Sequence, residues 1–91
     1  MVMINESTAI PVAYINQNGA IAYISEWRRW VLIGVDGALK FAPATLTIHT
    51  ETIEFALEVL GGRTEKVEHV TLREVQRKVS GKSKLASKVA T

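Results

Sequence analysis

Short runs of apolar residues, broken by turn-forming pairs, fill the first half of the chain and are typical of β-strands. Ile10–Asn16 and Ala20–Ser25 are rich in β-forming residues and flank Gln17-Asn18-Gly19. Asn-Gly suits the central positions of a type I′ turn, so we expect a hairpin with Tyr14 opposite Tyr23. An aromatic cross-strand pair would stabilise that register.

A second turn-forming pair repeats this pattern further along the chain. Asp36-Gly37 separates Trp30–Val35 from Ala38–Ala42. A two-residue turn there pairs Leu32 with Phe41. The pattern therefore predicts a second hairpin that follows directly on the first.

Thr45–Thr50 alternates again and brings the predicted antiparallel meander to about five strands. The third strand, Trp30–Val35, is unusual because both of its faces are apolar. Either other elements cover both faces, or one face is a subunit contact. The small size of the chain favours the contact. The predicted oligomer interface consists of Trp30, Val31, Leu32, Ile33 and Val35.

The second half of the chain changes to helical periodicity. Glu51–Leu60 predicts an amphipathic helix, capped by Thr50 and followed by Gly61 in a left-handed conformation. Its predicted inner stripe is Ile53, Ala56, Leu57 and Leu60. We expect one small α+β domain over residues 1–91, mainly β over 1–50, with a helix over 51–62 and a basic, mainly helical segment over 63–91.

Within the C-terminal segment, Lys66–Val70 is a candidate short strand. Thr71-Leu72-Arg73-Glu74 has the form of a capping box and opens a helix. Ser80-Gly81 is expected to interrupt that helix, with a third, short helix over Lys82–Ala90. Two helices in succession suggest a helix-turn-helix, but Arg77 and Ser80 stand where that motif prefers a small and an apolar residue. We therefore do not favour that motif.

Charge is divided at Gly61-Gly62. Three basic residues stand with six acidic ones before this pair, a net −3, and eight stand with three after it, a net +5. A basic segment favours an anionic partner, either nucleic acid or an acidic protein surface.

The candidate phosphate contacts lie mainly in that basic segment. Arg73 and Arg77 are one helical turn apart, as are Lys84 and Lys88, so each pair projects from one helix face. A solvated helix face is the structural alternative. The predicted nucleic-acid-binding residues are Arg73, Arg77, Lys78, Lys82, Lys84 and Lys88, with assistance from Arg28 and Arg29.

The cluster Trp27-Arg28-Arg29-Trp30 has two interpretations. On a strand, Trp27 and Arg29 share one face, and Arg28 and Trp30 share the other. The exposed face could stack a base and hold its phosphate. Alternatively, one tryptophan anchors the core and the other packs under an arginine, which we consider the better interpretation.

Enzymatic and metal chemistry have little support. His49 and His69 lie on separate predicted strands without an acid or nucleophile at a telling spacing, and Gly61-Gly62 ends a helix rather than opening one. We expect no catalytic activity, no cofactor and no metal. The chain has no cysteine, no signal-peptide pattern and no apolar run long enough to span a bilayer, which predicts a cytoplasmic protein without membrane contact.

Together these patterns predict an α+β fold: an antiparallel β-meander of about five strands, one packed amphipathic helix and a basic helical C-terminus. The predicted function is that of a small regulatory or accessory nucleic-acid-binding protein without base-specific readout. The alternative is a protein–protein interaction module, homo-oligomeric through the third strand, whose basic tail docks an acidic partner.

Overall fold

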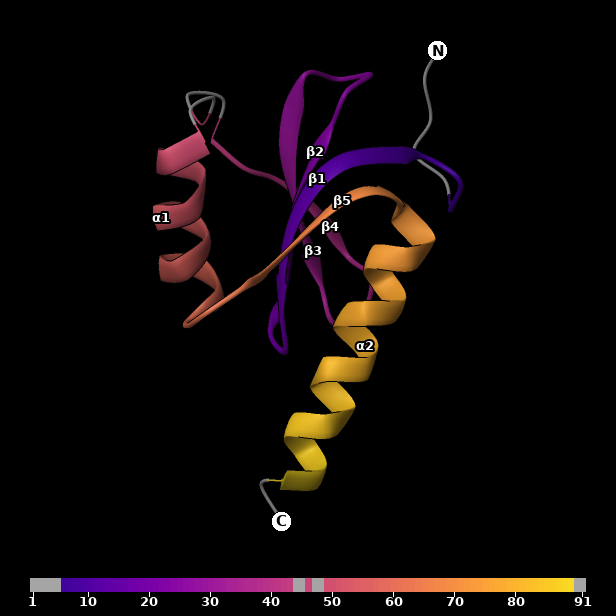
Figure 1. Ribbon diagram of the computed structural model, residues 1–91, viewed down its shortest axis with the longest axis vertical. Helices are drawn as coiled ribbons and strands as arrows, with labels where there is room; N and C mark the ends of the chain where they lie inside the picture. The colour runs from indigo at the N-terminus through magenta and orange to yellow at the C-terminus, as the bar shows by residue number, and fades with distance from the viewer. Residues whose placement is uncertain (1–5, 44–45, 47–48, 90–91) are drawn as a thin grey trace.

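A five-stranded antiparallel sheet lies between two helices in the computed structural model, which confirms the α+β class (Figure 1). The structure describes residues 6–43, 46 and 49–89, and for 49–51 and 83–89 it describes the backbone alone. The strand order is β4-β3-β2-β1-β5. The elements are β1 (Ala9–Asn16), β2 (Gly19–Ile24), β3 (Arg29–Gly34), β4 (Leu39–Phe41), α1 (His49–Leu60), β5 (Glu65–Thr71) and α2 (Leu72–Val89).

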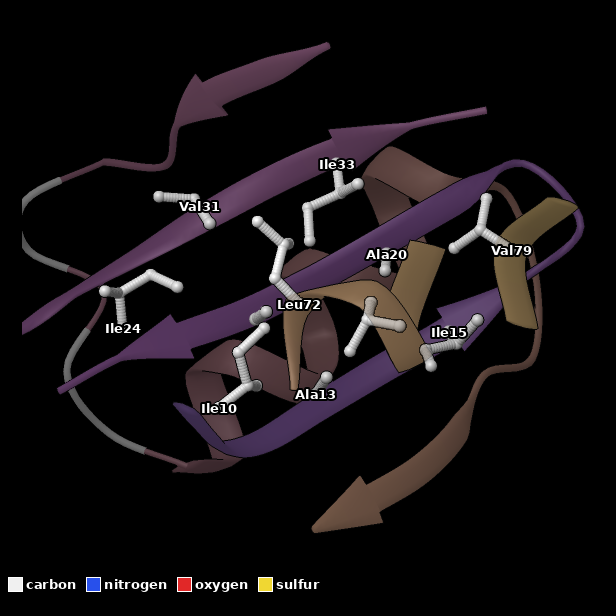
Figure 2. Packing of buried hydrophobic residues seen from close by; sticks show 11 residues of the cluster. Ile10, Ala13, Ile15, Ala20, Ile24, Val31, Ile33, Leu72 and Val79 are labelled. Carbon is white, nitrogen blue, oxygen red and sulfur yellow. The ribbon is translucent and has the colours of Figure 1, made fainter. Parts of the chain in front are cut away.

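Each helix covers one face of the sheet, so the core has two layers. On the α1 side, Ala56 and Leu60 pack with Tyr14, Ile21 and Trp30. The layer on the α2 side, shown in Figure 2, is built from Ile10, Ala13, Ile15, Ala20, Ala22, Ile24, Val31, Ile33, Leu72, Val75 and Val79. The two helices explain why β3 is apolar on both faces.

The first hairpin forms with a different register from the one predicted. Asn16 pairs with Gly19, and Tyr14 lies opposite Ile21 rather than Tyr23. The loop is Gln17-Asn18, and the Asn16 side chain explains the shift, because its Oδ1 accepts a hydrogen bond of 2.8 Å from the Asn18 backbone N–H. This local bond closes the turn one residue earlier than the Asn-Gly signal indicates.

The second hairpin differs from its prediction by one residue, which reverses the faces of β4. Val31 pairs with Phe41, and Ile33 pairs with Leu39, across a three-residue loop with Gly37 at φ 86°. A three-residue loop with a left-handed glycine is the next most common hairpin connection after the two-residue type. Because a one-residue shift moves every side chain to the opposite face, Leu39 and Phe41 lie on the α2 side of the sheet.

The strand predicted over Thr45–Thr50 is wrong where the structure tests it. His49 and Thr50 already belong to α1, whereas positions 44–45 and 47–48 lie outside the described residues. The fifth strand is instead β5, which corresponds to the weaker Lys66–Val70 signal and pairs with β1 at the far edge of the sheet. Alternation between threonines and apolar residues does not distinguish a strand from the start of this helix.

Helix α1 ends as the sequence predicts. Gly61 has φ 69°, and the backbone N–H groups of Gly61 and Gly62 both donate to the Leu57 carbonyl. The inner stripe is shifted, however: Thr52 is fully buried, whereas Leu57 is 42% exposed. Leu57 was therefore wrongly assigned to the core.

The end of α1 is tied to the β1–β2 loop. The side-chain amides of Asn16 and Asn18 both donate to the Leu60 carbonyl, at 3.0 and 2.6 Å. These bonds satisfy an acceptor that the helix end leaves open. They hold α1 against the sheet at the same turn that sets the hairpin register.

Helix α2 is continuous from Leu72 to Val89, so the predicted interruption at Ser80-Gly81 is wrong. The predicted cap forms at Thr71, because its hydroxyl oxygen accepts a hydrogen bond from the Glu74 backbone N–H at 3.3 Å and the hydroxyl donates to the Glu74 carboxylate at 3.3 Å. Gly81 lies inside the helix, and a Cβ built there would meet nothing within 4 Å. Without a turn there, these residues form no helix-turn-helix. Over the described residues, neither α1 nor α2 is long and apolar enough to cross a membrane.

Candidate nucleic-acid interface

The cations of α2 lie outside its buried stripe of Leu72, Val75 and Val79. Two of them have acidic neighbours: Arg73 Nε lies 3.8 Å from Glu6 Oε2, and Lys82 Nζ lies 3.2 Å from Glu65 Oε2. Arg77 and Lys78 are exposed and form no ion pair within the described part of the chain. Among the α2 side chains that the structure describes, these two cations have no ion pair and can meet an external anion.

The continuity of α2 relates the two cation pairs that the sequence suggested. Lys84 and Lys88 belong to the helix backbone, but their side chains lie outside the described residues. Eleven residues make about three turns of an α-helix. Positions 84 and 88 are therefore in phase with 73 and 77, along a stretch of about 22 Å. An interruption at Gly81 would have removed this phase relation.

The N-terminus of α2 offers little for anion binding. The backbone N–H groups of Leu72 and Arg73 donate to the carbonyls of Thr8 and Glu6, at 2.9 and 3.0 Å. The N–H of Glu74 is engaged by Thr71. An open depression of about 560 Å³ lies beside this end, but Glu6 lines it together with Ser7, Thr71 and Arg73. Phosphate contacts would therefore come from side chains and not from the helix terminus.

The Trp27–Trp30 segment is a loop followed by the start of β3, so its four residues do not lie on one strand. Arg28 is exposed and left-handed at φ 51°, which ends the loop before β3 begins. Trp30 is buried on the α1 side, with its ring centroid 5.3 Å from that of Tyr23. Trp27 and Arg29 nevertheless share the α2 side, since Trp27 packs on that layer and Arg29 pairs with Ile24.

Phe41 joins Trp27 and Arg29 in one cluster, which we call the aromatic patch. The ring centroids of Trp27 and Phe41 are 5.4 Å apart, and the Arg29 Cζ lies 4.4 Å from the Phe41 centroid. The Arg29 Nη2 donates to the Ala42 carbonyl at 2.9 Å, which fixes the guanidinium over the ring. Sequence reasoning missed Phe41, because the predicted register of β4 placed it on the opposite face.

A shallow groove of about 120 Å³ adjoins the aromatic patch and is lined by Trp27, Val31, Leu39, Lys40 and Phe41. Of the residues that the structure describes, no acidic one lines this groove. Phe41 is 52% exposed and Leu39 is 41% exposed, although both project from the face that α2 covers elsewhere. Helix α2 packs over β1, β2 and β5, and this leaves the β4 end of that face open.

The residues predicted to form an oligomer interface do not lie together on the surface. Trp30, Val31 and Ile33 are buried within the chain and Leu32 is half-buried, whereas Val35 is 51% exposed. The apolar surface that stays open belongs to β4 and Val35 rather than to the body of β3. Trp30, Val31 and Ile33 are therefore covered within the chain, and the oligomer interface stays a prediction.

Titratable groups elsewhere show little arrangement for chemistry. His69 is exposed on β5 with φ 53°, and the side chain of His49 lies outside the described residues. No three histidine, aspartate or glutamate side chains of the described residues converge to hold a metal ion. Burial, assisted by the negative charge of Glu68, raises the pKa of Tyr14 above its ordinary value.

Comparison with known proteins found no matching family model, no matching curated protein and no matching solved structure.

Proposed function

We propose that this protein binds nucleic acid through the exposed cations of α2. The proposal rests on Arg77 and Lys78, which are exposed and form no ion pair within the described residues. On the continuous helix, Arg77 lies opposite the buried stripe and Lys78 lies beside it. Positions 73, 84 and 88 extend the same helix in phase with 77. Such a row can neutralise successive phosphates and release counterions.

The proposed binding is electrostatic and does not read base sequence. Among the α2 cations whose side chains the structure describes, none is held by a network that would orient it toward base edges: Arg73 and Lys82 have one surface carboxylate each, and such pairs are weak. Affinity should therefore fall steeply with salt and vary little between unrelated sequences. Because the chain lacks cysteine, a reducing, cytoplasmic setting forms part of the proposal.

The test is a fluorescence-anisotropy titration of labelled duplex DNA at several salt concentrations. Arg77→Ala should weaken binding several-fold at low salt and flatten the log–log salt dependence by about 0.9. Lys66→Ala is the matched control, since it removes the same charge from β5, where Lys66 pairs with Glu68 at 3.4 Å. If Arg77→Ala and the parent bind equally at every salt concentration, the proposal fails.

A protein–protein module is the second candidate, and the exposed side chains of β4 and Val35 favour it. Self-association through β4 has an obstacle at its centre. An antiparallel pair of β4 strands in register about Lys40 would place two ammonium groups opposite each other. Light scattering at tens of micromolar distinguishes the candidates: a clean dimer that ignores DNA and RNA would support the module.

A further inference from the structure

The proposed phosphate contacts of α2 do not involve the groove beside the aromatic patch. Trp27 and Phe41 line it together with Leu39, Lys40 and the buried Val31, which lies directly opposite Phe41 in the sheet. Small-molecule sites typically measure about 300–1,000 Å³, so a groove of about 120 Å³ suits one flat ring rather than a whole cofactor.

The charges around the groove favour an anionic chain that carries such rings. Lys40 lines the groove, Arg29 is fixed over Phe41, and Arg28 is exposed next to both Trp27 and Arg29. Glu26 is the nearest acid in sequence, and it is absent from the groove lining. An acidic peptide would satisfy the cations but would leave the flat aromatic surface without a matching partner.

The groove and α2 lie on the same side of the sheet. Trp27 packs on the layer that α2 covers, and Figure 2 shows Val31 and Ile33 in that layer together with Leu72 of the helix. Gln76 of α2 approaches the β3–β4 loop, because a Cβ built on Gly37 would lie 3.9 Å from the Gln76 Nε2. One ligand could therefore contact the open strand end and the neighbouring helix.

We infer that the aromatic patch binds an unpaired base of single-stranded nucleic acid, while α2 contacts the phosphates. This inference rests on the proposed function and narrows its substrate to single strands. Bases in a duplex are stacked on their neighbours and present only their edges, whereas an unpaired base can lay its face on an aromatic ring. Stacking of this kind tolerates any base, which agrees with a groove whose described lining is mainly apolar, with Lys40 and the Trp27 indole as its hydrogen-bond donors.

The first experiment uses the parent protein and three labelled probes: a thymidine decamer, a decamer of abasic sites with the same phosphate charge, and a duplex. The decamer with bases should bind at least about fivefold more tightly than the abasic one. Equal binding of the two decamers overturns the inference but leaves the proposed function intact. Failure to bind any probe overturns both.

The second experiment assigns the base contact to the patch. Phe41→Ala should lower the affinity for the thymidine decamer by roughly 5- to 100-fold and leave the abasic decamer unchanged. Leu57→Ala is the matched control, since Leu57 is another exposed apolar side chain, on α1. Arg77→Ala should weaken both decamers alike. If Phe41→Ala still discriminates between the decamers as the parent does, base stacking on this patch is wrong.

Discussion

Two parts of the same sheet face have similar apolar side chains and different surroundings. Beneath α2, Ile10 and Ile15 are fully buried, together with Val75 of the helix. At the β4 end of the face, Leu39 and Phe41 are exposed although their cross-strand partners Ile33 and Val31 are buried. The position of one helix separates a core from an accessible surface. Apolar pattern alone therefore cannot tell which residues fold the protein and which remain available to a partner.

The strongest test of this contrast truncates two residues that face each other across β3 and β4. Ile33→Ala should lower the free energy of unfolding by about 2–5 kcal/mol, because it opens a cavity in a closed layer. Leu39→Ala should lower it by less than about 1 kcal/mol, because its side chain is already partly hydrated. Urea denaturation measures both. Equal losses would mean that the β4 end is as closed as the rest.

A second test loosens the attachment of α1 on the other face. Asn16→Ala removes the hydrogen bond to the Leu60 carbonyl and the acceptor for the Asn18 N–H, in a buried position. We expect a loss of about 1–3 kcal/mol. Asn18→Ala leaves the Asn16 bond to Leu60 in place and should cost less. If the two variants unfold at the same urea concentration, Asn16 does not hold α1 more strongly than Asn18 does.

A third test concerns the covering helix itself. Gly81→Ala should stabilise the protein by about 0.5–1 kcal/mol, since Gly81 lies inside α2 and has open space beside it. DNA binding should be preserved, because the helix keeps its phase. A fall in thermal stability on this substitution would indicate that the chain needs a glycine to break or bend the helix here.

The smallest expected effect concerns stability at alkaline pH. It depends on Tyr14, which is buried on the α1 side of the sheet and not at the open β4 end. The raised pKa of Tyr14 means that the folded state favours the neutral phenol. The neutral phenol stabilises the folded state fully below the pKa of about 10 that tyrosine has in the unfolded chain. This stabilisation is lost as the pH rises through the higher pKa that Tyr14 has in the folded protein. Tyr14→Phe should therefore reduce the decline of stability above about pH 10, measured by urea denaturation at several pH values. An unchanged slope would contradict this assignment.

The sequence predicted the elements that depend on local chemistry. The cap at Thr71 and the left-handed Gly61 are confirmed because each depends on neighbours within a few residues. The α+β class followed from the change in periodicity at the middle of the chain. The phosphate-binding role of the α2 cations stays a prediction, since exposure shows availability and not use.

The errors concern features that only the tertiary structure sets. The hairpin registers depend on the side-chain bond of Asn16 and on a three-residue loop after Gly34. The aromatic patch could not be predicted, because Phe41 joins Trp27 only in the correct register of β4. Similarly, the sequence does not reveal which layer each β3 residue joins: Trp30 packs on the α1 side, whereas Val31 and Ile33 pack on the α2 side.

In the proposed complex, one side of the molecule binds single-stranded nucleic acid: α2 contacts the phosphates and the aromatic patch contacts a base. Amide chemical shifts of the ¹⁵N-labelled protein, recorded with and without the thymidine decamer, map these contacts residue by residue. We expect shifts concentrated at Trp27, Arg29, Leu39–Phe41 and along Arg73–Lys82, with Glu54–Val59 of α1 unchanged. Shifts concentrated on α1, or none at saturating decamer, would rule out this binding surface.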